Sequence, residues 1–258
     1  MTAEIANRHW FESYKVFVGD IGGEFRNYGV VGAFLGGIPL PFANGCLVLR
    51  PAAPADLDEA LTWVGAANVP FTARLLESLV ADVAPVLVDH GLVRDEPMPG
   101  MVLKPIPATP DPAPGIEVEA VDDDSYANFV EVLIATGLPE EWAERTFGSH
   151  LLEAEHLVFF LARLDGRPVG TSLAVRTGDI GGIYTVGTVE DARRRGVGTA
   201  VTWAAVEQIR DWGCTAAVLQ SSAMGYPMYR AMGFEEVVRY ARFKPAPTEP
   251  ALAKPPTA

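Results

Sequence analysis

Two groups of residues in the second half of the chain have the types and spacing to do chemistry. The first is the run Arg193-Arg194-Arg195-Gly196-Val197-Gly198, which is followed by Thr199. Glycines let a backbone approach a ligand closely, arginines present forked donors that suit phosphate, and the first N–H groups of a helix attract anions. The run therefore predicts a site for a phosphate-bearing ligand. The alternative is an ordinary turn with solvated arginines.

The second group is the segment Tyr229-Arg230-Ala231-Met232-Gly233-Phe234, near the C-terminal end of the chain. A tyrosine hydroxyl can act as a general acid by donating a proton to a leaving group. The alternative is a core tyrosine whose hydroxyl bonds to the backbone. Both interpretations stay open from the residue alone.

Other reactive side chains form no recognisable centre. The four histidines lack metal-ligand spacing, no G-x-S-x-G element is present, and Cys214 has no evident base partner. Cys46 and Cys214 instead have the apolar neighbours of reduced, buried cysteines. We therefore expect neither a metal nor a covalent intermediate. His150 and His156 flank the stretch from the second predicted helix of this half to the strand after it, near the expected acceptor pocket.

Hydrophobic periodicity and turn residues predict the elements that must position both groups. After a proline-rich connector at 104–115, the predicted order is strand, two helices, three strands, helix, strand, helix and strand. The strand at 180–189 leads into the arginine run, and a helix begins at Val197. Such an order predicts an α/β (α+β) fold, a mixed sheet with helices on its faces.

The two groups, in this order and between these elements, resemble the GNAT superfamily of N-acetyltransferases. Arg193, Gly196 and Gly198 match the R-x-x-G-x-G loop that binds the acyl-CoA pyrophosphate, and 229–234 matches the Y-x-x-x-G-F element. The resemblance covers roughly the second half of the chain. It implies a GNAT-type, mostly antiparallel sheet flanked by helices, acetyl-CoA as cosubstrate without a metal, and direct attack of an amine on the thioester.

The resemblance also implies roles for individual residues. The main chain of Val186, Gly187 and Thr188, in a bulged strand, would bind the pantetheine arm and the thioester oxygen. The N–H groups from Arg194 to Gly198, with Thr199, would hold the pyrophosphate, beside Arg193. Tyr229 would protonate the departing CoA thiolate.

The chain departs from the family pattern at two places. Ser222 stands where many members have an asparagine that contacts the cofactor, and the strand at 183–187 lacks the glutamate that some members use as general base. The base is then a water chain, a carboxylate such as Glu131 or Glu141, or unnecessary if the amine arrives neutral. Transfer of a longer acyl group, or acylation of a protein N-terminus or lysine, remains open. A non-catalytic acyl-CoA-binding or protein-interaction module is the alternative function.

The first half of the chain carries neither motif. Its patterns predict packed strands and turns at 19–37, a strand at 45–50, helices at 54–67 and 75–90, and a strand at 101–104. The segment 86–103 resembles 229–243, so a degenerate GNAT-like duplication is a hypothesis. The predicted domains are an N-terminal α/β domain at 1–103, a linker at 104–115, a catalytic domain at 116–243 and a disordered tail at 244–258.

Composition limits the partners. The chain has 20 Lys and Arg against 33 Asp and Glu, a net charge of −13. Such a surface repels phosphate backbones and attracts protonated amines, so we expect a small-molecule or peptide amine and no nucleic acid. Without a secretory h-region or an apolar run of about 20 residues, we expect a cytoplasmic protein that does not enter membranes. The N-terminal half could close the acceptor pocket or form a homodimer.

Overall fold

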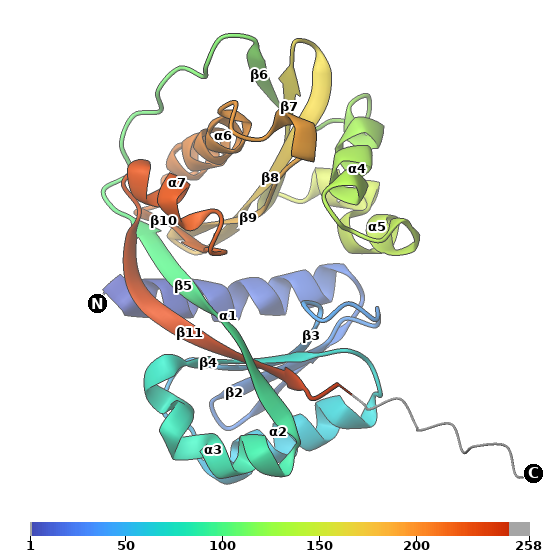
Figure 1. The fold of residues 1–258 in the computed structure, drawn as a ribbon, viewed down its shortest axis with the longest axis vertical. Helices are drawn as coiled ribbons and strands as arrows, with labels where there is room; N and C mark the ends of the chain where they lie inside the picture. The colour runs from blue at the N-terminus through green and yellow to red at the C-terminus, as the bar shows by residue number, and fades with distance from the viewer. Residues whose placement is uncertain (1, 248–258) are drawn as a thin grey trace, which may run out of the picture.

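The computed structural model describes residues 2–247, in which eleven strands form one continuous sheet (Figure 1). The strand order is β1-β2-β3-β4-β11-β5-β10-β9-β8-β7-β6. The strands are β1 (Glu24–Tyr28), β2 (Val31–Leu35), β3 (Asn44–Val48), β4 (Thr72–Leu76), β5 (Leu92–Leu103), β6 (Ile116–Ala120), β7 (Leu157–Leu164), β8 (Arg167–Thr177), β9 (Ile180–Thr188), β10 (Ala216–Gln220) and β11 (Glu235–Pro245). The helices are α1 (Thr2–Asp20), α2 (Pro54–Ala66), α3 (Val80–Asp89), α4 (Tyr126–Ala135), α5 (Glu140–Phe147), α6 (Val197–Asp211) and α7 (Tyr226–Ala231).

The element order predicted for the second half of the chain is confirmed, from β6 through α4, α5, β7, β8, β9, α6, β10 and α7 to β11. This order could be predicted because the turns between its elements require particular residue types. Asp165 and Gly166, between β7 and β8, have φ angles of 53° and 82°, as a type I′ hairpin turn requires. The mixed α/β sheet with flanking helices is likewise confirmed.

The first half differs from its prediction in three places. Helix α1 is missing from the prediction, because its hydrophobic pattern is weak. The helix predicted at 75–90 begins only at Val80, since Leu75 and Leu76 end β4, which lies between β3 and β11, and residues 77–79 form a 3-10 turn. The strand predicted at 101–104 is the end of a longer strand, β5. Pro97 argues against a strand when the sequence is considered alone, because proline has no N–H to donate to a neighbouring strand. In the structure it lies at a register shift in the pairing with β11, where a missing N–H is tolerated.

The two halves exchange their last strands at the centre of the sheet. Strand β11 lies between β4 and β5, and β5 pairs with β10. Read outward from this centre, β11-β4-β3-β2-β1 and β5-β10-β9-β8-β7 have the same sequence of antiparallel and parallel pairings. The predicted pair of similar domains is therefore confirmed at the level of strand order, and the halves are interlocked by backbone hydrogen bonds.

The structure describes the predicted linker and the first residues of the predicted tail. Residues 104–115 contain no helix or strand. Of the predicted tail, Lys244 and Pro245 instead end β11 by pairing with Val93 and Leu92. The rest of the tail from residue 248 lies outside the described residues.

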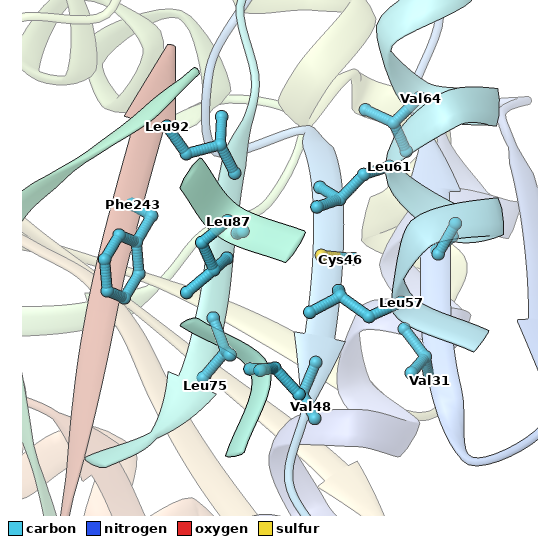
Figure 2. Close-up of a cluster of buried hydrophobic side chains, with 14 of the residues drawn as sticks. Val31, Cys46, Val48, Leu57, Leu61, Val64, Leu75, Leu87, Leu92 and Phe243 are labelled. Carbon is cyan, nitrogen blue, oxygen red and sulfur yellow. The ribbon is translucent and has the colours of Figure 1, made fainter. Parts of the chain in front are cut away.

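Helices cover both faces of the sheet. In the N-terminal half, Cys46 and Val48 of β3 pack under α2 and α3 (Figure 2), whereas Leu47 packs against α1 on the other face. In the C-terminal half, Leu219 of β10 packs on α6 and Val218 on α1. Helix α1 thus spans both halves on the face opposite α2, α3 and α6. No helix within residues 2–247 has the length and apolar character to cross a membrane.

Helix α1 is held to the sheet through His9, whose side chain is fully buried. Its Nδ1 lies 2.6 Å from the Thr177 hydroxyl, and its ring stacks on Tyr184. The fit depends on Gly182, because a Cβ there would lie 2.0 Å from the His9 Nε2. Burial, with a smaller contribution from Arg8, lowers the pKa of His9 to about 3.

We expect the protein to lose stability steeply in acid because of His9. Between about pH 6.5 and pH 3 the unfolded chain protonates this imidazole and the folded chain does not, so the free energy of unfolding falls as pH falls. A shift of this size corresponds to about 5 kcal/mol across that window. Urea unfolding of wild type and His9→Gln at pH 7, 6, 5 and 4 measures the difference. Parallel pH profiles for the two proteins would contradict the assignment.

Candidate active site

The arginine run forms the turn between β9 and α6. Arg194 and Gly196 adopt left-handed φ angles of 62° and 91°, and Gly196 is the N-cap of α6. The first N–H groups of a helix have no partners within the helix, and no side chain caps those of α6. Arg193, Arg194 and Arg195, whose side chains are exposed, directly precede this helix start in the chain. This concentration of donors and positive charge can hold an anion.

The three arginines are only loosely engaged. The Arg193 Nε donates to the Thr188 carbonyl oxygen at 3.3 Å, and Arg195 lies 3.4 Å from the Asp165 carboxylate. Arg194 makes no side-chain hydrogen bond within the described part of the chain. Exposed pairs of this kind contribute little to stability. The guanidinium groups can therefore turn towards a ligand at small energetic cost.

Strands β9 and β10 separate beyond Gly182, which leaves a gap in the sheet. They pair in parallel only over 180–182 of β9, after which β9 is bonded to β8 alone up to Thr188. The pairing with β8 shifts register after Tyr184, so that Thr185 and Val186 form a β-bulge, and Thr185 has a φ of 49°. Backbone groups of β9 on the side of β10 are left without strand partners in this gap.

A cavity of about 700 Å³ opens at the gap, on the face that carries α1, α4 and α5. Its lining comes from three parts of the chain. The sheet and α7 contribute Ile183, Tyr184, Thr185, Val186, Gly187, Gln220, Ser222 and Tyr229; the α4–α5 region contributes Leu133, Thr136, Gly137, Leu138, Pro139, Thr146 and Phe147; and the N-terminal half contributes Trp10, Ser13, Tyr14, Val16, Phe17, Asp20, Leu40, Pro41, Phe42 and Met98. Apolar and aromatic side chains predominate, as is usual for small-molecule sites.

Tyr229 lies at the α7 end of this cavity. Its side chain is 7% exposed and packs edge-on against Phe234. Burial raises the pKa of Tyr229 to about 12, so the phenol stays protonated at neutral pH. No hydrogen bond to its hydroxyl occurs within residues 2–247. A protonated hydroxyl without a protein partner can donate to a group bound in the cavity.

Among the described residues, two further polar atoms at the cavity are buried without a hydrogen-bond partner. They are the Thr185 hydroxyl oxygen in the bulge and the Gln220 Nε2 at the end of β10. Buried polar atoms are nearly always hydrogen-bonded in folded proteins. Unsatisfied donors and acceptors on both sides of the gap are consistent with a site that receives a polar ligand between β9 and β10.

The structure brings part of the predicted site together in the cavity. Val186, Gly187, Ser222 and Tyr229 line it. Thr188 and residues 193–199 lie just outside, along the end of β9 and the start of α6. An added Cβ at Gly198 would lie 3.6 Å from the Thr188 hydroxyl and 3.2 Å from the Met228 sulfur, so this small residue lets the turn approach β9 and α7 closely.

The charged and polar residues of the lining differ from those that the sequence suggested. Glu131 and Glu141, considered above as bases, are exposed and do not line the cavity. Within the described residues, the charged side chain in the lining is Asp20, from the end of α1. Thr185, Gln220 and Asp20 were missed because only the fold brings them to the same space. No cluster of three His, Cys, Asp or Glu suited to a metal occurs within residues 2–247.

Comparisons with known proteins extend these observations. The family model described as Acetyltransferase (GNAT) family matches residues 124–234. A GCN5-related N-acetyltransferase from Kribbella flavida is 21% identical over 96% of this chain and 96% of its own, with a TM-score of 0.71. A tandem GNAT protein from the clavulanic acid biosynthesis pathway is 17% identical over 85% of this chain and 79% of its own, with a TM-score of 0.57.

A GCN5-related N-acetyltransferase from Sphaerobacter thermophilus is 20% identical over 74% of this chain and 66% of its own, with a TM-score of 0.56. Among proteins with curated functions, none matches the sequence. At these identities the solved structures establish the fold, and their coverage extends it to the N-terminal half. Both motifs lie within residues 124–234, the part of the chain that the acetyltransferase (GNAT) family model matches.

Proposed function

We propose that this protein is an N-acetyltransferase that moves the acetyl group of acetyl-CoA to an amine. The observation that carries the proposal is the shared cavity of the bulged strand β9 and Tyr229, next to the anion-binding turn at the start of α6. Acyl transfer needs donors near the carbonyl oxygen and an acid near the leaving sulfur. Both kinds of group are present on the two sides of one gap.

The fit to acetyl-CoA rests on the donors described above. The N–H groups from Arg194 to Gly198, with the Thr199 hydroxyl, would bind the pyrophosphate, and the neighbouring guanidinium groups would add charge. The unpaired backbone of Val186, Gly187 and Thr188 would bind the pantetheine arm as a strand partner. The Ser222 hydroxyl oxygen accepts a hydrogen bond from the Gly225 N–H at 3.1 Å, so its own hydrogen can be donated to a ligand.

The reaction that we propose is direct. The amine nitrogen attacks the thioester carbonyl, an N–C bond forms, and the C–S bond breaks. Backbone N–H groups at the bulge would stabilise the negative charge on the oxygen. Tyr229 would donate its proton to the departing sulfur, and the nitrogen loses one proton to water, so that the products are an amide and CoA thiol. The phenol is then reprotonated from solvent.

A non-catalytic acyl-CoA-binding module remains the second candidate. It is favoured by the lack of a glutamate in β9 and by the exposed positions of Glu131 and Glu141. Release of CoA thiol in the presence of a panel of primary amines distinguishes the two. Tight binding without thiol release for any amine would favour the binding module.

The N-terminal half lacks the features on which the cofactor site depends. The strand of the N-terminal half that corresponds to β9 is β3. It pairs with β2 without a register shift and stays bonded to β4 from Gly45 to Val48. The helix that corresponds to α6 is α2, which begins at Pro54 and carries Asp56 in its first turn. A carboxylate there repels anions, and proline supplies no N–H. We therefore assign the cofactor to the C-terminal half alone.

Calorimetric titration with acetyl-CoA should give micromolar binding and a stoichiometry of one per chain. CoA should bind more weakly, and ATP, which shares the phosphates but lacks the pantetheine arm, should bind far more weakly. Two equivalents per chain would contradict the assignment to one half. No binding at millimolar acetyl-CoA would mean that the arginine run is only a structural turn.

A further inference from the structure

The far wall of the cavity comes from the N-terminal half and is built on one side of α1. Trp10, Ser13, Tyr14 and Phe17 follow one another at helical spacing, and Asp20 continues the same side at the end of the helix. These residues face the sheet and the α4–α5 region across the cavity. The wall that would contact an acceptor therefore lies outside the segment 124–234.

The two ends of this wall differ in chemistry. At one end the Ser13 hydroxyl lies 2.8 Å from the hydroxyl of Tyr184, the residue just before the β9 bulge. At the other end, seven residues further along α1, is the carboxylate of Asp20. At 1.5 Å per residue the two positions are about 10 Å apart along the helix. Asp20 is thus too distant to act on a nitrogen that is attacking a thioester at the bulge.

Between these ends the cavity is apolar. The ring of Phe17 lies 6.1 Å from that of Phe42 and 6.4 Å from that of Phe147, and Tyr14 and Leu138 complete this middle section. Aromatic faces suit alkyl chains and also attract cations. The middle of the cavity therefore favours an apolar spacer rather than a hydrated, polar one.

Asp20 is held in a fixed position and still has a free acceptor. Its Oδ2 lies 2.9 Å from the His156 Nε2, and its side chain is 22% exposed. Within residues 2–247 no hydrogen bond reaches its Oδ1. It supplies the formal negative charge in the lining, and the overall charge of −13 adds to the attraction for cations. A bound ammonium group could pair with Oδ1 without displacing His156.

We propose that the acceptor is an elongated amine with a second cationic group, and that Asp20 binds this group while the reacting nitrogen lies at the β9 bulge. The spacer between the two nitrogens lies among Tyr14, Phe17 and Phe147. Asp20 is then a specificity-determining residue contributed by the N-terminal half. This inference rests on the proposed acetyl transfer and specifies its substrate class.

The test compares octane-1,8-diamine with octylamine, which has the same chain and lacks the second nitrogen. Initial rates of CoA thiol release are measured for wild type, Asp20→Asn and Glu12→Gln at saturating acetyl-CoA. Glu12 lies on the same helix, is exposed and does not line this cavity, so its variant controls for the loss of one negative charge. Circular dichroism and acetyl-CoA titration verify that each variant is folded and binds the cosubstrate.

We expect wild type to prefer the diamine by at least about tenfold in kcat/KM, as one charge-assisted hydrogen bond predicts. Asp20→Asn should remove this preference mainly by raising the KM for the diamine, with octylamine and the Glu12→Gln control unaffected. Equal use of both amines by wild type, or an equal loss for both in Asp20→Asn, would overturn the proposal. If acetyl-CoA binds and neither amine reacts, this acceptor class is wrong. If acetyl-CoA does not bind, the acetyl-transfer function itself fails.

Discussion

Replacing Tyr229 by phenylalanine should lower the turnover number by about 10–100-fold and leave acetyl-CoA affinity nearly unchanged. The ring fills the same space against Phe234, so packing is retained. The lost hydroxyl has no hydrogen-bond partner within residues 2–247, so its removal orphans no group there. Only proton donation to the leaving sulfur is removed. Steady-state kinetics with a reactive amine, together with calorimetric titration, separate the two effects.

Tyr226→Phe is the matched control for this experiment. Tyr226 lies on the same short helix, α7, and does not line the cavity. Its variant should keep both turnover and affinity. Because burial raises the pKa of Tyr229 to about 12, wild type should also show no loss of turnover from phenol ionisation up to about pH 10. Unchanged turnover in Tyr229→Phe would remove this residue from the mechanism.

A tryptophan at Gly196 should lower acetyl-CoA affinity by about 100-fold or more, because several charge-assisted hydrogen bonds would be lost. A Cβ at this position has room, 3.5 Å from the Ile116 Cδ1 and 3.6 Å from the Ala113 Cβ. The indole beyond it would occupy the space in front of the first N–H groups of α6. The left-handed φ of 91° adds a strain of about 1–2 kcal/mol, so the variant should fold with somewhat lower stability.

Gly213→Trp supplies the comparison, because Gly213 follows the other end of α6 with a left-handed φ of 73°. It carries similar strain and the same added side chain, and it should retain acetyl-CoA binding. Thermal unfolding of both variants checks that they are folded to similar extents. If Gly196→Trp binds acetyl-CoA as wild type does, the pyrophosphate is held elsewhere.

The parts of this structure that could be predicted from the sequence are those that local chemistry determines. The hairpin at Asp165 and Gly166 and the turn from Arg193 to Gly198 need particular backbone angles, and those angles need particular residues. These turn residues made it possible to predict the order of strands, helices and motifs in the second half. The roles of Tyr229 and of the turn in catalysis and binding remain predictions that the experiments above address.

The parts that could not be predicted depend on partners far away in the sequence. The apolar pattern of β4 is compatible with a helix as well as with a strand. The segment is a strand because it pairs with β3 on one side and β11 on the other. Asp20 meets His156, and Ser13 meets Tyr184, across more than half of the chain. No periodicity or spacing within one segment carries that information, so the wall of the cavity that α1 contributes could be found only from the fold.

The central position of β11 has a consequence for the order of events during synthesis. A ribosome releases the N-terminal half first, and domains generally begin to fold as they emerge. Yet β4 cannot gain its second neighbour, and β5 cannot be covered on that side, until β11 has been made. Until then both strands present open edges, which are prone to aggregate. Synthesis of β11 is therefore the step that closes both halves at once.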